Sequence, residues 1–455
     1  MPRLVLALAI VAACLAPPAR AFDDTTEKKI GDYLAACVEA EQFNGTVLVA
    51  RDNERLVSRG FGLANFEHEI PNTPQTKFRL GSITKQFTAM AIMILQERGK
   101  LSVDDRISKY LDASPETWKD VTLHHLLSHT SGIPNLTSFP DFRQTIRLAA
   151  TPAGMIDRFR DKPLEFVPGE KFAYSNSGYI LLGVAIEKAA GKPYEAFLRE
   201  AIFEPLGMNE TGYDHFEEII TSRAAGYQRG ASLANAEFID MSLPYAAGAL
   251  YSTVGDLHRW HEALSAGTLL SEKATTALFT PVKGDYAYGW NVQTRSGHVV
   301  TSHGGGINGF ATSILRIPDQ NICIVVLSNT VPAPAGRMTN DLASLLLGQP
   351  YPLPKIRRVA EVDPKVYDEL AGRYELAPSL IMTVSRQGDR LLTQITGQPQ
   401  VEIFPESESD FFLRVVDAQL TFFRNQEGQV THLILHQGGR DIEAKRLAAE
   451  APPAK

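Results

Sequence analysis

A helix expected at residues 82–98 constrains the fold more than any other feature, because its centre is apolar on every side. Residues 89–95 contain no polar side chain, and Gly99 follows as an end signal. Such a helix has no face to present to water, so other elements must surround it. The 455 residues are enough to bury a core of that size without disulfide bonds.

Strand patterns stand near both ends of a long segment around this helix. They lie at residues 45–50, 54–61, 299–302, 313–317 and 322–328. Helical patterns precede and follow them, at residues 27–42 and 337–347. Strands at the two ends with helices between them predict an α+β architecture, in which the two ends of the segment close one sheet.

A Pro-rich segment predicts a linker at residues 349–361. Beyond it, short alternating runs from residue 380 to residue 447 are separated by Gly, Asp, Asn or Pro. This spacing is typical of a small antiparallel β-barrel or sandwich. We therefore expect a first domain at residues 22–348 and a second domain at residues 362–448.

Residues 1–21 are predicted to be a secretory signal peptide. Arg3 precedes an apolar run at residues 4–16, and Ala19 and Ala21 are small residues of the kind that a signal peptidase recognises. The run is too short for a membrane-spanning helix, which needs about 20 residues. The mature chain is therefore expected to be secreted or periplasmic. The alternative is a lipoprotein that associates with a membrane through a lipid on Cys14.

The charge balance argues against nucleic acid as a partner. The chain has 45 Lys and Arg against 52 Asp and Glu, a formal net charge of −7, and no long basic run. It also lacks the Gly-x-x-x-x-Gly-Lys loop, the His-Glu-x-x-His zinc signature and the nucleophile elbow of α/β-hydrolases. The expected partner is a small-molecule or peptide substrate, and no cofactor is expected.

Two cysteines remain in the predicted mature chain, Cys37 and Cys323, and both stand in apolar contexts. In an oxidising compartment they could form a disulfide bond. They could equally be two buried free thiols, so the sequence leaves both alternatives open.

Ser82 and Lys85 form a Ser-x-x-Lys motif at the start of the apolar helix. A spacing of three residues sets both side chains on one helix face. A serine hydroxyl needs an adjacent base to act as a nucleophile, and a lysine desolvated against an apolar helix is disposed to a lowered pKa. The pair therefore predicts a nucleophile with its partner, and the alternative is an ordinary helix cap.

Two further motifs carry candidate binding residues. Tyr174 and Asn176 stand in a loop that opens a helix expected at residues 178–190. His303 lies at a strand edge and is followed by three glycines, residues 304–306, which let another backbone approach closely and bring a backbone N–H to a ligand. The structural alternatives are a capped turn for the first motif and a packed strand histidine for the second.

Taken in order, the three motifs resemble the serine β-lactamase and penicillin-binding protein superfamily, in particular its class C-like branch with D-aminopeptidases, D-Ala-D-Ala carboxypeptidases and esterase-like hydrolases. The likeness covers roughly residues 25–347 and includes the segments 78–81, 123–133, 174–189, 204–208, 247–257 and 288–290. It implies an antiparallel sheet flanked by helices, with an all-helical subdomain. Residues 362–448 resemble the lipocalin-like β-barrel that some of these hydrolases carry.

The resemblance also implies roles for individual residues. Ser82 would be the acylated nucleophile, Lys85 its partner, and Tyr174 a phenolate-like base that also protonates the leaving group. The oxyanion hole would consist of the backbone N–H groups of Ser82 and Gly306. The residues expected to contact substrate are Asn176, His303, Gly304, Gly305 and Trp290.

His303 departs from the β-lactamase pattern, which usually has Lys at this position. A lysine supplies a permanent positive charge, whereas histidine is mostly neutral at pH 7 with an ordinary pKa of about 6.5. The substitution favours hydrolysis of D-amino-acid-containing peptides and amides or of small esters. The alternatives are a β-lactamase and, from another class, a catalytically weak protein that binds or senses penicillin or cell-wall peptides.

Other residues suggest functions that the sequence supports less well. His124, His125 and His129 include an i, i+4 pair, yet no carboxylate or Cys stands in register to complete a metal site. They are predicted to pack and end a helix, and no metal is expected. Tyr288 and Phe310 could form, with Trp290, the wall of an acyl pocket, or all three could be core residues.

Overall fold

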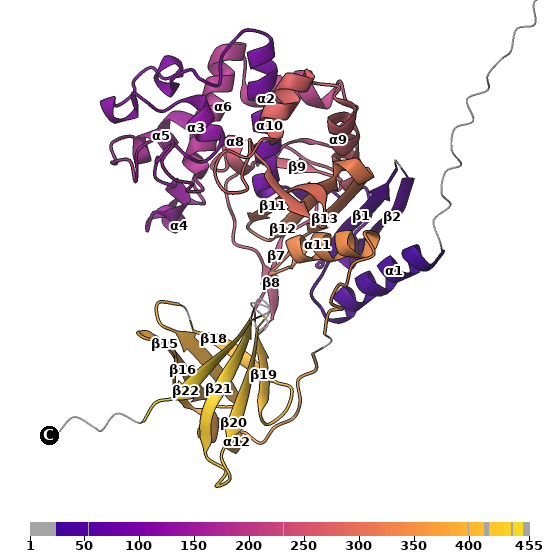
Figure 1. Ribbon diagram of the computed structural model, residues 1–455, viewed down its shortest axis with the longest axis vertical. Coiled ribbons are helices and arrows are strands. Elements are labelled where there is room, and N and C mark those ends of the chain that lie inside the picture. The colour runs from indigo at the N-terminus through magenta and orange to yellow at the C-terminus, as the bar shows by residue number, and fades with distance from the viewer. Residues whose placement is uncertain are drawn as a thin grey trace, which may run out of the picture.

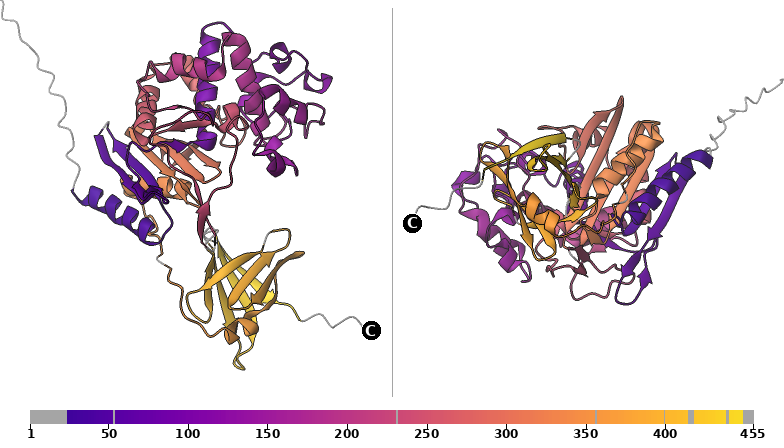
Figure 2. Two further views of the ribbon diagram at one scale, coloured as in Figure 1. Left: turned by 180° about the vertical axis from the view of Figure 1, so that it is seen from behind. Right: turned by 90° about the horizontal axis from the view of Figure 1, so that it is seen from below.

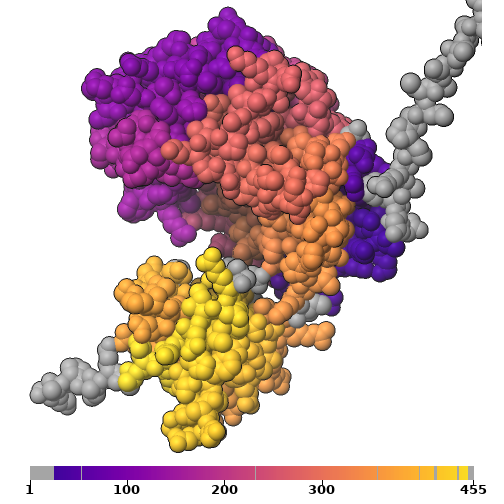
Figure 3. Space-filling view, in the orientation of Figure 1, coloured from indigo at the N-terminus to yellow at the C-terminus, as the bar shows by residue number. Residues whose placement is uncertain are grey.

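The computed structural model describes residues 24–52, 54–230, 232–355, 357–398, 400–413, 418–437 and 440–448. These residues form an α+β domain and a closed β-barrel (Figure 1). Figure 3 shows the barrel as a separate lobe beside the larger domain. The predicted signal peptide, with Cys14, lies outside the described residues. Among the described helices, none has both the length and the apolar character needed to cross a membrane.

A six-stranded antiparallel sheet forms the framework of the α+β domain. In spatial order its strands are β10 (Asn291–Arg295), β11 (His298–Ile307), β12 (Phe310–Ile317), β13 (Ile322–Ser328), β1 (Gly45–Arg51) and β2 (Glu54–Phe61). β1 pairs with β13 from Gly45↔Ser328 to Arg51↔Ile322. The two ends of the domain therefore meet inside the sheet, as the sequence predicts.

The two faces of the sheet bury different clusters. Helices α1 (Asp24–Glu39) and α11 (Ala335–Leu346) lie side by side on one face (Figure 1, Figure 2). Cys37 belongs to the cluster on that face, whereas Cys323 belongs to the cluster on the other face, where α9 (Val254–Ala266) packs. Both are buried free thiols, which resolves the alternatives that the sequence left open.

The helical subdomain surrounds α2 (Thr84–Glu97), whose residues 84–95 are all buried. Its other helices are α3 (Leu123–Leu127), α4 (Phe142–Thr145), α5 (Pro152–Arg160), α6 (Asn176–Ala190), α7 (Tyr194–Leu198), α8 (Tyr245–Gly248) and α10 (Glu272–Phe279). Helices α6, α7, α8 and α10 contact α2 directly. The prediction of a helix enclosed by other elements is confirmed, as is the fold class.

Single-turn helices connect these elements. The 3-10 turns are η1 (Gly81–Ile83), η2 (Ile107–Tyr110), η3 (Glu116–Trp118), η4 (Leu136–Ser138) and η6 (Pro318–Gln320), and η5 (Arg199–Phe203) is a π-helix. Three small sheets complete the domain: β3 (Leu63–Asn65) with β4 (Ile70–Pro71); β5 (Phe78–Arg79), β9 (Leu250–Ser252) and β6 (Gly212–Tyr213); and β14 (Thr330–Val331), β7 (Tyr227–Arg229) and β8 (Leu233–Asn235).

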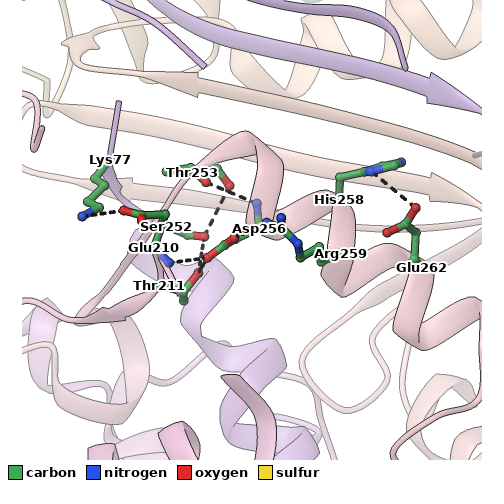
Figure 4. Close-up of polar contacts among 9 residues, drawn as sticks. All are labelled: Lys77, Glu210, Thr211, Ser252, Thr253, Asp256, His258, Arg259 and Glu262. Carbon is green, nitrogen blue, oxygen red and sulfur yellow. Dashed lines mark hydrogen bonds and ion pairs between the residues drawn. The ribbon is translucent and has the colours of Figure 1, made fainter. Parts of the chain in front are cut away.

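Strand β9 is anchored by a buried polar network (Figure 4). Asp256, which has no exposed surface, accepts hydrogen bonds from the backbone N–H of Glu210 and the hydroxyl of Thr211, both at 2.8 Å. The Thr211 and Ser252 hydroxyls lie 2.7 Å apart, and Ser252 belongs to β9. Since β9 pairs with β5, this network supports the strand that leads into residue 82.

The C-terminal barrel closes with eight antiparallel strands. They are β15 (Gly372–Ala377), β16 (Leu380–Gln387), β17 (Arg390–Ile395), β18 (Val401–Pro405), β19 (Asp410–Leu413), β20 (Ala418–Arg424), β21 (Val430–Gln437) and β22 (Arg440–Arg446), preceded by helix α12 (Lys365–Leu370). Apolar side chains fill the interior, where the rings of Phe411 and Phe422 lie 5.6 Å apart. The barrel predicted from the sequence is confirmed.

Candidate active site

Ser82 lies in the turn η1, directly before α2, where it is partly exposed. Leu80 donates its backbone N–H to the carbonyl of Leu250 at 2.8 Å, which ties this turn to β9. Gly81 has φ +55°, and a Cβ atom at Gly81 would lie 3.0 Å from the backbone nitrogen of Gly306. The glycine therefore lets the turn and β11 approach closely.

Lys85 is fully buried one helical turn after Ser82. Its Nζ lies 3.2 Å from Ser82 Oγ, 2.8 Å from Asn176 Oδ1 and 2.8 Å from the carbonyl oxygen of Ala247. Burial lowers the pKa of Lys85 well below its ordinary value. The two carbonyl oxygens can only accept hydrogen bonds, so a neutral amine that donates to both has its lone pair left for the Ser82 hydroxyl.

Tyr174 lies in the loop before α6, beside the same amine. Lys85 Nζ is 4.9 Å from the centroid of the Tyr174 ring. Burial raises the pKa of Tyr174, and a hydrogen bond with Ser82 only partly opposes this shift. The phenol form is therefore favoured at neutral pH, whereas the resemblance implied a phenolate-like group.

Asn176 starts α6 and is held from three sides. Besides accepting from Lys85, its side chain donates from Nδ2 to Thr137 Oγ1 at 3.1 Å, and its backbone N–H donates to Asn135 Oδ1 at 3.0 Å. The sequence did not single out Asn135 or Thr137. Their only signal is their position directly after the segment at residues 123–133.

His303 is 4% exposed, and both of its ring nitrogens have partners within the protein. Nδ1 lies 2.6 Å from the carbonyl oxygen of Gly304, so Nδ1 carries the proton. Nε2 lies 3.0 Å from the hydroxyl of Tyr286 and accepts its hydrogen bond. Burial lowers the pKa of His303 to about 4. The ring is therefore neutral at pH 7 and presents no free nitrogen to a ligand.

The three glycines of β11 bring the strand edge against the nucleophile turn. A Cβ atom at Gly305 would lie 1.9 Å from the carbonyl oxygen of Leu80, which excludes any side chain there. Thr312 of the neighbouring strand donates to the same carbonyl at 2.7 Å. Gly304 and Gly306 are exposed, so the predicted oxyanion donor at Gly306 and the Ser82 turn share one accessible edge.

The aromatic residues predicted to line an acyl pocket lie in the core. Trp290 has no exposed surface and packs against Phe279, with ring centroids 5.4 Å apart. Phe310 is 2% exposed, and the Tyr288 hydroxyl lies 2.6 Å from His124 Nδ1. A fully buried side chain cannot touch a substrate, so the predicted substrate contact of Trp290 is corrected to core packing.

The three histidines near α3 have separate structural environments. His124 contacts Tyr288, and His125 Nδ1 accepts the backbone N–H of Thr122 in a capping box at the start of α3. His129 lies beside Tyr174 instead. In the part of the chain that the structure describes, no group of three or more His, Cys, Asp or Glu side chains is arranged to hold a metal ion.

Comparison with known proteins defines the class to which this fold and site belong. Residues 30–348 match the model of the Beta-lactamase family, and residues 357–447 match a domain of unknown function, DUF3471. The chain therefore belongs to the Beta-lactamase family, which includes the serine hydrolases of the β-lactamase and penicillin-binding protein type.

Two of the similar proteins span almost the whole chain, and a third spans the first domain. Penicillin-binding protein 4* of Bacillus subtilis (strain 168) is 31% identical and covers 90% of this chain and 96% of its own. The octameric penicillin-binding protein homologue from Pyrococcus abyssi has a TM-score of 0.65 at 28% identity, over 93% of this chain and all of its own. D-amino acid amidase from Ochrobactrum anthropi SV3, at 23% identity and a TM-score of 0.63 over 71% of this chain and 98% of its own, shares the fold.

Proposed function

We propose that this protein is a hydrolase that forms an acyl-enzyme on Ser82. The observation that carries the proposal is the placement of Lys85 Nζ, which is buried and lies within 3.2 Å of Ser82 Oγ while donating to Asn176 and Ala247. This arrangement supplies a neutral amine beside a partly exposed hydroxyl, as nucleophilic catalysis by serine requires.

In the first step, the Ser82 hydroxyl gives its proton to the lone pair of Lys85 Nζ as Oγ attacks the substrate carbonyl carbon. The carbonyl oxygen becomes an oxyanion, for which the backbone N–H groups of Ser82 and Gly306 are the proposed donors. Each such donor contributes about 3 kcal/mol to the transition state in other acyl-transfer sites. Lys85, rather than a Tyr174 phenolate, is the base in this proposal, because burial moves the two pKa values in opposite directions.

In the second step, the leaving group departs as its bond to the carbonyl carbon breaks. Tyr174 donates its phenolic proton to the leaving nitrogen or oxygen, and the Lys85 ammonium returns a proton to Tyr174. A water molecule then attacks the acyl-enzyme by the reverse proton path, which releases the acid and restores Ser82.

The proposed substrates are D-amino-acid-containing peptides or amides, or small esters. The neutral, fully bonded His303 supports this choice, because it supplies no positive charge for the carboxylate of a penicillin. The main alternative within the same chemistry is a β-lactamase. A catalytically weak penicillin- or cell-wall-peptide-binding protein is a second candidate function, favoured by the similarity to penicillin-binding protein 4*.

Steady-state kinetics on four substrate types separates these candidates: D-amino acid amides, D-Ala-D-Ala peptides, short acyl esters and nitrocefin. The proposal expects kcat/KM for an amide, peptide or ester to exceed kcat/KM for nitrocefin. The highest value for nitrocefin would support the β-lactamase, and stoichiometric acylation without turnover of any substrate would support the binding protein.

We also propose that the mature protein is secreted or periplasmic, with the predicted signal peptide removed after Ala21. Intact-mass measurement of the protein purified from its native cells tests this, since cleavage leaves a chain that begins at Phe22. A lipid-modified chain beginning at Cys14 would support the lipoprotein alternative, and a full-length chain would contradict both.

A further inference from the structure

His129 contacts the residues on both sides of Tyr174. Its carbonyl oxygen accepts the backbone N–H of Ala173 at 2.9 Å, and its Nδ1 accepts the backbone N–H of Ser175 at 3.1 Å. The His129 and Tyr174 ring centroids lie 4.2 Å apart. Residues 171–175 belong to no helix or strand, so these two backbone N–H groups need acceptors from elsewhere, and His129 supplies both.

The imidazole ring is enclosed on its other sides. Its centroid lies 4.7 Å from that of Tyr286 and 5.1 Å from that of Tyr179, and the residue is 1% exposed. Burial lowers the pKa of His129 well below its ordinary value, so the ring is neutral. With Nδ1 accepting, the proton is on Nε2, which is buried and has no hydrogen-bond partner among the described residues.

Two features of His129 oppose folding stability. A buried donor without an acceptor is unfavourable, and the backbone at His129 has φ +56°, in the left-handed region that few residues other than glycine adopt. An apolar ring would avoid the first penalty and a glycine the second. Residues that combine such features are common at functional sites, where the surrounding structure holds them for another purpose.

We propose that His129 is the positioning residue for Tyr174, and that it holds the phenol against Ser82 and Lys85 by fixing the backbone on both sides of the tyrosine. This inference rests on the proposed function, because it assigns His129 a role in the same acylation reaction. It adds that His129 acts only through Tyr174 and touches neither the nucleophile nor the substrate.

Two substitutions at His129 separate the acceptor from the ring. In His129→Asn, the side-chain oxygen stands at the same number of bonds from Cα as Nδ1, and Asn tolerates a positive φ. In His129→Phe, a ring of similar shape remains, but the acceptor for the Ser175 N–H is lost. His258→Phe is the control, because His258 is also 1% exposed and neither of its ring nitrogens has a hydrogen bond. A charged neighbour of His258 is Glu262, whose Oε1 lies 3.7 Å from Nδ1 (Figure 4).

The readout is acylation of Ser82 by a probe whose leaving nitrogen takes the Tyr174 proton, because the fluoride released from a fluorophosphonate needs none. The probe is a fluorescent penicillin, with the labelling rate followed by intact mass, or a D-amino acid amide, with kcat/KM in place of the labelling rate, if the penicillin does not react. Thermal unfolding is measured in parallel. We expect His129→Phe to slow labelling at least tenfold, and His129→Asn to stay within about threefold of the unsubstituted protein. His258→Phe should leave the labelling rate within twofold. These expectations hold for the folded fraction of each variant, which the unfolding curves define.

The same substitutions in a Tyr174→Phe background give the decisive comparison. If His129 acts through Tyr174, His129→Phe should slow labelling less than twofold once the phenol is absent. Equal losses in both backgrounds would overturn the inference, since they indicate a general structural role, and so would full activity of His129→Phe with Tyr174 present. Failure of both a fluorescent penicillin and a fluorophosphonate to label Ser82 of the unsubstituted protein would instead overturn the proposed function.

Discussion

Replacing His303 with Gln should make the α+β domain less sensitive to acid. In the folded protein, the pKa of His303 is lowered from 6.5 to about 4 because the ring is fully buried. Between these two values the unfolded chain binds a proton that the folded chain does not, so the free energy of unfolding falls as the pH falls. The stabilising contribution of neutral His303 is complete above pH 6.5 and is lost as the pH drops toward 4.

The expected size follows from the shift. Each pH unit inside this window changes the free energy of unfolding by about 1.4 kcal/mol for one proton, which gives a loss of about 2 kcal/mol between pH 7 and pH 5. His303→Gln cannot bind that proton, while its side-chain oxygen can still accept from Tyr286. Four other histidines with lowered pKa values do not depend on His303, so their effects cancel in the difference: His124, His125, His258 and His261. The pKa of His129 is lowered mainly by burial and in small part by His303, so its change in His303→Gln acts in the same direction as the predicted difference.

Urea unfolding followed by tryptophan fluorescence measures this difference at each pH. The three tryptophans of the chain are Trp118, Trp260 and Trp290, all in the α+β domain, so the signal does not report unfolding of the barrel. The unsubstituted protein should lose about 2 kcal/mol more than His303→Gln between pH 7 and pH 5. Parallel pH curves for the two proteins would refute the conclusion that His303 is buried in its neutral form.

Three further predictions test the site. His303→Lys should shift relative kcat/KM about 5- to 30-fold toward carboxylate-bearing substrates such as penicillins, because the longer lysine side chain can carry its ammonium from this buried position to the exposed strand edge. Unchanged ratios in steady-state assays would remove position 303 from substrate selection. Lys85→Ala and Tyr174→Phe should each lower kcat/KM roughly 10²- to 10⁴-fold, and the double variant should be little worse, whereas multiplied losses would mean independent action. Gly305→Ala should lower the free energy of unfolding by about 1–3 kcal/mol and slow Ser82 labelling, because its Cβ would meet a backbone oxygen at 1.9 Å. Gly304→Ala is the matched control for stability, with its nearest contact at 3.6 Å, and an equal loss of unfolding free energy in both variants would contradict the packing argument.

The fold could be predicted from the sequence because its central elements are buried so completely. β13 is buried at every position, and residues 84–95 of α2 are buried on every side, so both appear as uninterrupted apolar runs. The short elements at the edge of the domain were not predicted, among them β7 and β8. Each has three residues and partly exposed side chains, which leaves too short a pattern to detect.

The motifs predicted which residues form the candidate site, but they did not predict the contacts among those residues. His303 Nε2 has a partner because the Tyr286 hydroxyl lies 3.0 Å away, and no local motif signals that contact. His129 lies in the turn after α3, where its backbone has a positive φ. A histidine in the sequence gives no sign of that conformation. For Trp290 the sequence predicted a substrate contact that does not exist. An aromatic residue beside a motif suits a pocket wall and a core equally well, and only its burial in the structure distinguishes the two.

The central claim is that Ser82 is the nucleophile, and covalent labelling tests it most directly. Intact-mass measurement after incubation with a fluorescent penicillin or a fluorophosphonate should show a single adduct on the unsubstituted protein and none on Ser82→Ala. Ser108→Ala, at an exposed serine of η2, is the matched control and should be labelled normally. An adduct that persists unchanged in folded Ser82→Ala would contradict the account.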